Sequence, residues 1–404
     1  MPSSTLPEND CPVTVSPSST SSRGLSGGLY ALALGGFGIG LTEFVISGLL
    51  SSVAADLRVT VPAAGALIWG YALAVVVGAF TVTAFLARRQ PRTALLVLLA
   101  LFVLGNALTA LSPNFVVAVA GRMITALCHG GFFGIGAVVA VDLVPAHRRA
   151  SALAVMFGGL TLSNVLGVPF GTFIGQQLGW RVAFWIIAAI GVLAMAGVRT
   201  LVPALPAPPA QQTKAQYAVL RRPQVIVSMG LTMLLFGGLF GAFIYVEPLV
   251  TNVTGYPASA VPWLLIAFGV GLFVGNVVGG RAADKDLAAS LRVLAVLLPV
   301  ALFGYGCVAS WKAPVAVLLV VIGLVGFATT PALQVRVMRF AGDAPTLASA
   351  ANIAAFNLGN AIGSALGGLA ITIGLGWRSP IFVGAGMALI GTVLAFTTNH
   401  GEVQ

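Results

Sequence analysis

The sequence predicts an all-α membrane protein with twelve transmembrane helices, arranged as two pseudo-symmetric six-helix bundles. Three observations predict this fold: scarce charge, regularly spaced apolar stretches and an internal repeat. Of the 404 residues, 58% are hydrophobic and only 7% are charged, whereas a soluble domain carries about 25% charged residues. So few charges cannot cover a water-exposed surface of this size. Most of the surface is therefore expected to face lipid.

The apolar stretches have the length of membrane spans. A helix needs about 20 residues to cross about 30 Å of hydrocarbon. The segment 1–27 is rich in Ser, Thr and Pro and is expected to be a disordered cytoplasmic tail. On this scale the expected spans are 28–51, 62–86, 93–111, 114–141, 150–176, 180–202, 224–247, 259–280, 291–310, 313–333, 346–373 and 379–398.

The basic residues predict the orientation of these spans. Most arginines and lysines fall in one alternating set of gaps, as Arg89, Arg149 and Arg222 do. The other set holds few, among them Arg58 and Arg181. Cytoplasmic loops carry the excess of positive charge, so both termini are expected in the cytoplasm and the chain is expected in the inner (plasma) membrane. The net charge of +10 therefore reflects the orientation of the spans in the membrane, and we expect no nucleic-acid partner.

The longest internal gap divides the spans into six and six. It covers 203–223, holds four prolines and is basic at its end, which is typical of a linker. We expect an N-terminal bundle at 28–202, a cytoplasmic linker at 203–223, a C-terminal bundle at 224–398 and a cytoplasmic tail at 399–404.

The two halves resemble each other in sequence. The tetrapeptide LGWR occurs at Leu178–Arg181 and again at Leu375–Arg378. One run of glycines at every fourth residue could arise by chance, but three runs, two of them in equivalent spans, favour a duplication. Small residues let two helix backbones approach closely, and two halves that rock about a central site produce alternating access. The runs are Gly167, Gly171 and Gly175; Gly271, Gly275 and Gly279; and Gly359, Gly363 and Gly367.

Three segments carry a resemblance to a known family. They read GLTEFVISGLLSSVAADL (Gly40–Leu57), GRMITALCHGGFFGIGAVVA (Gly121–Ala140) and MFGGLTLSNVLGVPFGTFIGQQLGWR (Met156–Arg181). Over residues 28–398 the chain resembles the major facilitator superfamily, in particular the bacterial 12-span drug:proton antiporters of the arabinose-efflux and chloramphenicol-efflux types. The resemblance implies the major facilitator fold.

The resemblance also implies a direction of transport. The pair Gly167 and Pro169, followed by Gly171, is similar to the family's antiporter motif, which bends span five and separates exporters from importers. The loop after span two departs from the family pattern, because an arginine of the Arg88–Arg89 pair stands at the usual acidic position. The second-half copy keeps Arg281 and Asp284. We expect that a conformational latch based on a carboxylate at this first-half position is altered or absent.

Two charges stand out deep inside the expected spans. A charge at bilayer depth costs roughly 2.5–3.5 kcal/mol even on insertion scales, so it is a functional hypothesis by default. Glu43 lies roughly 22 Å from the inner end of its helix, and Arg122 lies roughly 12 Å from the outer end of its own. The depths are compatible with a direct or water-bridged ion pair. We predict that Glu43 carries a proton or contacts a cationic group and that Arg122 biases its protonation. The alternative is a static buried salt bridge.

A third titratable group lies on nearly the same face as Arg122. His129 follows seven residues later, and an imidazole titrates near neutrality and can pass a proton. The alternative is a neutral histidine bonded to a carbonyl. Glu247, before Pro248, is expected at the outer interface.

Aromatic and amide side chains mark a candidate substrate cavity. Any one such aromatic more often packs helices or faces lipid, and amides in spans more often join helices. A site with few charges and many aromatics nevertheless suits neutral or weakly polar lipophilic substrates. The predicted cavity residues are Phe37, Phe44, Phe133, Asn164, Phe240, Tyr245 and Asn360.

These observations favour one function over its competitors. An enzyme needs a nucleophile–base set or metal ligands, and ATP drive needs a phosphate-binding loop; neither motif occurs. We expect no enzyme activity, no cofactor and no metal. The sequence predicts a monomeric secondary transporter for proton-coupled efflux of small lipophilic compounds, an antibiotic such as chloramphenicol or several drugs. The alternative, suggested by the arabinose-efflux type, is an exporter of a sugar or other polar metabolite.

Overall fold

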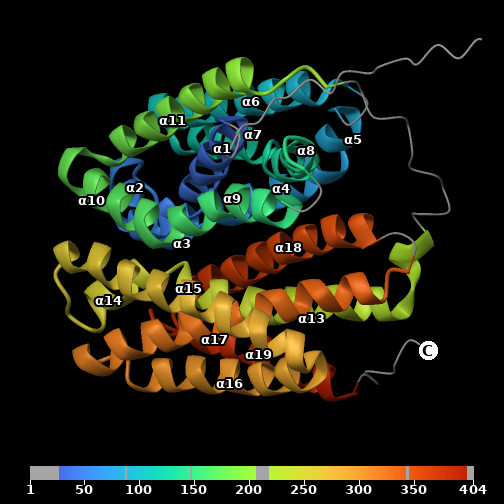
Figure 1. Ribbon diagram of the computed structural model, residues 1–404. Helices are drawn as coiled ribbons and strands as arrows, with labels where there is room; N and C mark the ends of the chain where they lie inside the picture. The colour runs from blue at the N-terminus through green and yellow to red at the C-terminus, as the bar shows by residue number, and fades with distance from the viewer. Residues whose placement is uncertain (1–26, 87–88, 146–147, 206–217, 343–344, 398–404) are drawn as a thin grey trace, which may run out of the picture.

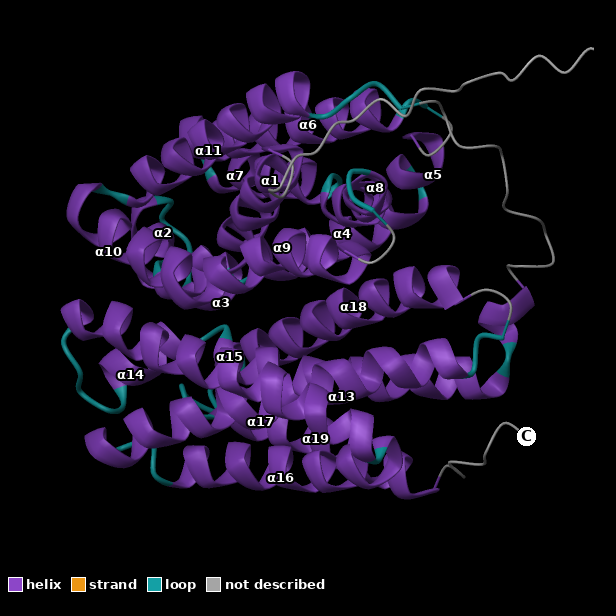
Figure 2. Ribbon diagram, viewed as in Figure 1, coloured by secondary structure: helices purple, strands orange, loops and turns teal. Residues whose placement is uncertain are grey.

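The protein is helical throughout the part that the structure describes. The computed structural model describes residues 27–86, 89–145, 148–205, 218–342 and 345–397, which form helices joined by short loops (Figures 1 and 2). Twelve helices there are long and apolar enough to cross a membrane, which confirms the predicted number. Of the expected disordered tail at 1–27, residues 1–26 lie outside the described residues and Gly27 begins a helix. Arg88, the middle of the linker at 206–217 and the tail at 399–404 also lie outside the described residues.

The first half contains spans one to six. Several spans are broken into shorter helices, and these breaks position the charged side chains described below. In chain order the elements are α1 (Gly27–Phe44), the 3₁₀ turn η1 (Val45–Gly48), α2 (Leu50–Asp56), α3 (Val61–Ala64), α4 (Ala66–Phe80), α5 (Val82–Leu86), α6 (Pro91–Leu111), α7 (Phe115–Ala126), α8 (His129–Asp142), α9 (Arg149–Leu162), the π-helical turn η3 (Ser163–Gly167), α10 (Val168–Leu178) and α11 (Trp180–Leu201).

The second half contains spans seven to twelve. In chain order its elements are η4 (Val219–Arg221), α13 (Pro223–Phe243), α14 (Val246–Asn252), η5 (Ala258–Ala260), α15 (Val261–Lys285), α16 (Leu287–Cys307), α17 (Lys312–Arg339), α18 (Pro345–Thr372) and α19 (Ser379–Thr397). Helix α15 continues five residues past the expected end of span eight, through Arg281 and Asp284. Long charged side chains can reach water while their helix continues, so charge marks the membrane boundary and not the helix end.

The two halves form two groups of helices with equivalent packing. In Figure 1 the elements from α1 to α11 lie together, and the elements from α13 to α19 form the other group. In the first half α1 packs against α9 and α6 against α11; in the second half α13 packs against α18 and α16 against α19. These pairs correspond to spans one and five, three and six, seven and eleven, and nine and twelve. The predicted pseudo-symmetric arrangement is therefore confirmed.

The glycine runs lie where helices approach most closely. A Cβ on Gly363 of α18 would overlap the carbonyl oxygen of Gly237 in α13, and a Cβ on Gly275 of α15 would overlap the carbonyl oxygen of Leu324 in α17. At these positions backbone meets backbone, as small residues in membrane helices allow.

Several contacts that join the two halves lie at one end of the bundle. We call it the Ser51 end, and the opposite end the Arg89 end. The side chain of Glu247 in α14 accepts hydrogen bonds from Ser51 in α2. Gln176 donates to the carbonyl of Ala258 over 3.1 Å. Helix α4 of the first half also packs against α18 of the second. The two halves are therefore in contact along α4 as well as at the Ser51 end.

Candidate functional site

Glu43 lies at the point where span one stops being a regular α-helix. It is the second-last residue of α1, and the chain continues as the 3₁₀ turn η1. The residue is only 8% exposed. Its carboxylate oxygen Oε2 lies 3.9 Å from Nδ1 of His129. The carboxylate therefore faces an imidazole inside the first half.

Arg122 is fixed by oxygens of two neighbouring helices. The residue is fully buried in α7. Its Nε donates to the carbonyl of Leu67 over 3.1 Å. Its Nη1 donates to the carbonyl and the hydroxyl of Thr42, over 2.6 and 2.9 Å, and Nη2 donates to the carbonyl of Glu43 over 3.3 Å. A guanidinium has five N–H donors in a planar fork, and most of them are used here.

The expected ion pair between Glu43 and Arg122 is replaced by a different contact. The guanidinium reaches the backbone carbonyl of Glu43, while the carboxylate of Glu43 faces His129. The depths are compatible as expected, but the carboxylate of Glu43 faces the start of α8, whereas Arg122 lies in α7 of the same span. Arg122 therefore acts on Glu43 as a nearby positive charge and not as a direct partner.

Tyr71 and Asn106 complete this site, and sequence reasoning assigned neither of them to it. The guanidinium carbon of Arg122 lies 4.3 Å from the centre of the Tyr71 ring, a cation–π geometry. The hydroxyl of Thr42 donates to Oδ1 of Asn106 over 2.7 Å, and Asn106 donates to the carbonyl of Phe102. The signal that could have found them is their polarity within apolar spans.

His129 begins α8, just after span four is interrupted between Ala126 and His129. The residue is 5% exposed. Besides Glu43, its Nδ1 faces the hydroxyl of Tyr71 at 3.4 Å, and its ring lies 5.3 Å from that of Phe133. The structure thus brings together all three predicted proton-coupling residues. A buried carboxylate and an imidazole at this separation form a place where one proton can reside on either group.

Two predicted cavity residues meet across the two halves. The rings of Phe44 in α1 and Phe240 in α13 stack with their centroids 4.9 Å apart. Phe236 and Phe243 continue this cluster within α13, at 4.6 and 5.9 Å from Phe240. Phe133 belongs to the first half and stacks on Phe157 at 5.4 Å. Aromatic side chains adjoin the Glu43–His129 pair through Phe44, which follows Glu43 in α1, and through Phe133, whose ring contacts that of His129.

The polar cavity candidates have varied surroundings. Tyr245 donates its hydroxyl to the carbonyl of Ser364 over 3.0 Å, and so it joins α18 to the loop between α13 and α14. Asn164 donates to the carbonyl of Leu160 in its own span. Asn360 is 2% exposed, and its Oδ1 makes no hydrogen bond to another described residue.

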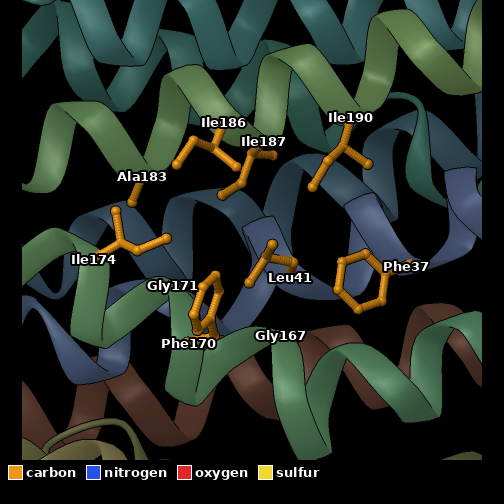
Figure 3. A pocket seen from close by; sticks show the side chains of 10 residues that line it. All are labelled: Phe37, Leu41, Gly167, Phe170, Gly171, Ile174, Ala183, Ile186, Ile187 and Ile190. Atoms are coloured by element: carbon orange, nitrogen blue, oxygen red, sulfur yellow. The ribbon is translucent and has the colours of Figure 1, made fainter.

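Phe37 lines a separate apolar pocket inside the first half. This cavity of about 250 Å³ lies between α1, α10 and α11, and Figure 3 shows only carbon side chains pointing into it. Two of its lining residues, Phe170 and Ile186, are also exposed on the outside of the half. The pocket is lined by Phe37, Leu41, Gly167, Phe170, Gly171, Ile174, Ala183, Ile186, Ile187 and Ile190.

The predicted conformational motif interrupts span five. Gly167 ends the π-helical turn η3, and α10 begins at the next residue with Pro169 in its first turn. π-turns occur mostly as single turns inside α-helices. At the Arg89 end, the guanidinium of Arg89 lies over the Phe85 ring at 5.9 Å. Arg281 and Asp284 are both exposed, and Arg88 lies outside the described residues.

Comparison with known proteins identifies the family. A model of the Major Facilitator Superfamily matches residues 32–354 and 232–403. The chain belongs to this superfamily. It is therefore a multi-pass membrane transporter, as the resemblance implied.

The relatives of this major facilitator protein include named transporters. It is 42% identical over 376 residues to the inner membrane transport protein YdhP of Escherichia coli, covering 93% of this chain and 97% of the relative. It is 35% identical to the chloramphenicol resistance protein of Streptomyces lividans, covering 91% and 95%. The crystal structure of the D-xylose–proton symporter matches with a TM-score of 0.73 at 16% identity, over 92% of this chain and 97% of the symporter. That last likeness shows the fold alone.

Proposed function

We propose that this protein exports small lipophilic compounds in exchange for protons across the inner membrane. The observation that carries the proposal is the buried pair of Glu43 and His129, with 3.9 Å between Oε2 and Nδ1. Ionisable groups inside a membrane protein mark proton or substrate pathways. This distance is longer than a hydrogen bond, so a proton passes between the two groups when they move closer or through one water. A neighbouring cation changes whether the protonated or the ionised carboxyl group is favoured.

Arg122 supplies that cation without taking the proton. Its guanidinium is held by the carbonyls of Leu67, Thr42 and Glu43, and arginine stays charged in proteins. Its fixed positive charge favours the ionised carboxylate of Glu43, whereas burial favours the protonated acid. A conformational change that lets water reach Glu43 alters this balance, so proton release is linked to the movement of the halves.

The contacts between the halves support an inward-facing arrangement. The distribution of basic residues predicts that the Ser51 end faces outward. The hydrogen bonds between Ser51 and Glu247 and between Gln176 and Ala258 close that end. Rocking of the two halves would break these contacts and expose the aromatic region to the outside.

The aromatic region supports a lipophilic substrate. Phe44 and Phe240 face each other from the two halves, and the chloramphenicol resistance protein is a relative over almost its full length. The competing reading, export of a sugar or other polar metabolite, needs free polar side chains. In the second half, Thr232, Asn352 and Gln334 bond to one another, over 2.7 and 2.8 Å, and among the described amides Asn357 and Asn360 keep an oxygen without a hydrogen bond.

The test is export from vesicles with an imposed pH gradient. Purified protein in proteoliposomes should drive uphill movement of chloramphenicol or ethidium, and Glu43→Gln should abolish it while the protein remains inserted. Asp286→Asn is the matched control, because it removes an exposed carboxylate and an asparagine can still cap α16 as Asp286 does through Ala289. Gradient-driven export by Glu43→Gln at the normal rate would contradict the proposal.

A further inference from the structure

The pair of Glu43 and His129 has a third member on another helix. Tyr71 of α4 is 1% exposed, and its hydroxyl lies 3.4 Å from Nδ1 of His129. The same nitrogen faces Oε2 of Glu43 at 3.9 Å. One ring nitrogen therefore has two possible partners, and the tyrosine hydroxyl is the nearer one.

The position of the Tyr71 hydroxyl is set by its ring and by its helix. The ring lies under the guanidinium of Arg122, which is itself fixed by backbone carbonyls. Helix α4 packs against α7 in its own half and against α18 in the other. Six residues before Tyr71, Gly65 lies directly against the hydroxyl of Tyr245 in the second half. Movement between the halves therefore acts on α4, and through α4 on Tyr71.

The hydrogen bond to Nδ1 decides the form of the imidazole. In a neutral histidine one ring nitrogen is a donor and the other an acceptor, and the bond made by one nitrogen fixes which is which. When the phenol donates to Nδ1, that nitrogen cannot carry a proton, and the neutral ring keeps its proton on Nε2. The titratable groups that face the site are Glu43 from α1, Tyr71 from α4, Arg122 from α7 and Cys128 beside His129.

We propose that Tyr71 is a positioning residue that determines when His129 can take the proton of Glu43. This inference rests on the proposed proton coupling. While Tyr71 donates to Nδ1, the proton stays on the carboxyl group of Glu43. When α4 shifts and the hydroxyl withdraws, the O–H bond of Glu43 breaks and an N–H bond forms at Nδ1. The products are a carboxylate and an imidazolium, and Tyr71 keeps its own proton throughout.

The test observes the imidazole directly. His147 and His400 are the other two histidines of the chain, so a His147→Gln, His400→Gln background leaves one ring for ¹⁵N-histidine NMR in lipid bilayers. We expect an unprotonated Nδ1 in the chain with Tyr71 at fixed neutral pH. Tyr71→Phe should raise the fraction of rings with a proton on Nδ1 by about two- to tenfold, the factor that one net hydrogen bond represents.

A second buried tyrosine provides the matched control. Tyr305 of α16 is 2% exposed, and its hydroxyl makes no hydrogen bond to another described residue. Tyr305→Phe should leave the Nδ1 signal unchanged, and Tyr71→Phe should also shift the pH profile of export. An Nδ1 signal that is the same with and without the Tyr71 hydroxyl would overturn the inference. That result leaves the proposed function standing if Glu43→Gln still abolishes export, so the two proposals fail separately.

Discussion

Glu247 and Ser51 join the two halves of the protein through a single carboxylate oxygen. Oε2 of Glu247 accepts hydrogen bonds from the backbone amide of Ser51 over 3.1 Å and from its hydroxyl over 2.6 Å. Glu247 is 7% exposed, although its place beside Pro248 suggested an interfacial side chain. The contact is buried because α2 and α14 pack against each other at the Ser51 end.

Removal of this carboxylate should loosen the Ser51 end. Hydrogen bonds to a charged group contribute about 1.5–3 kcal/mol each, so Glu247→Ala should move the population of the closed end by about tenfold or more. Spin labels at Ala55 and Asn252, which are exposed on α2 and α14, would report the separation. We expect longer distances in Glu247→Ala and a smaller change in Glu247→Gln. Identical distance distributions in all three proteins would show that the contact does not hold the halves together.

Asp56 should make the stability of this end depend on pH. Its side chain is 45% exposed and forms an ion pair with Arg181, and Nε1 of Trp180 donates to the same oxygen over 3.1 Å. The hydrogen bond from Arg181 is the main cause that lowers the pKa of Asp56 below its usual value. A lowered pKa adds stability above about pH 4, the unfolded-state value, and this stability is lost as the pH falls through the lower value in the folded protein.

The measurement is the melting temperature in detergent from pH 3 to pH 7. Asp56→Asn should melt lower than the unchanged protein at neutral pH, and the difference should shrink below about pH 4. Asp284→Asn, which removes an exposed carboxylate of α15, serves as the control. A difference between Asp56→Asn and the parent that is constant over the whole range would contradict the role of the charge.

Gly363 should tolerate no side chain. A Cβ there would overlap the backbone of Gly237 in α13, and overpacking of this kind costs about 1–3 kcal/mol. We expect Gly363→Ala to lower the melting temperature and the yield of inserted protein. Gly386 of α19 has open space around its Cβ position, so Gly386→Ala should be neutral or slightly stabilising, since alanine is the better helix former. Equal effects at both positions would disprove close packing between α13 and α18.

Arg122 should be irreplaceable by lysine. A lysine has one compact ammonium group and cannot reproduce the planar fork that reaches Leu67, Thr42 and Glu43. We expect Arg122→Ala to abolish export and Arg122→Lys to reduce it at least about tenfold, because leaving buried carbonyls unpaired costs about 1–3 kcal/mol each. Export in proteoliposomes and the melting temperature should both fall. Full export by Arg122→Lys would indicate that only the positive charge matters.

Much of the fold could be predicted because its signals are local. Apolar length determines a span, and the glycine runs mark close helix contacts, as Gly275 and Gly363 confirm. Helices α15 and α17 extend beyond the expected spans eight and ten, because the helix continues through charged residues such as Arg281 and Arg336 past the apolar stretch. The exact limits of the tails, the linker and the two bundles stay predictions.

The site was only partly accessible to sequence reasoning. Glu43, Arg122 and His129 stand out as rare ionisable residues in apolar spans, and the structure brings them together. Which atoms meet could not be predicted, because α1 changes to a 3₁₀ turn after Phe44 and span four breaks before His129. These breaks redirect side chains in a way that a regular helical period does not show. Tyr71 was not assigned to the site for the same reason, since its contact with His129 depends on the direction of its hydroxyl.

The π-helical turn at Ser163–Gly167 has a consequence for sequence design in this protein. A π-turn contains an additional residue compared with an α-turn, and α10 follows it directly. Below that turn, Gly171 packs against Leu41 and Val45 of span one, whereas the equivalent span α18 runs without interruption. Deleting one residue from the turn would leave a regular α-turn and keep Gly171 against span one, whereas deleting a residue at the start of α10 would rotate the rest of that helix by about 100° and place Thr172 there. The π-turn therefore tolerates a change of length that α10 does not.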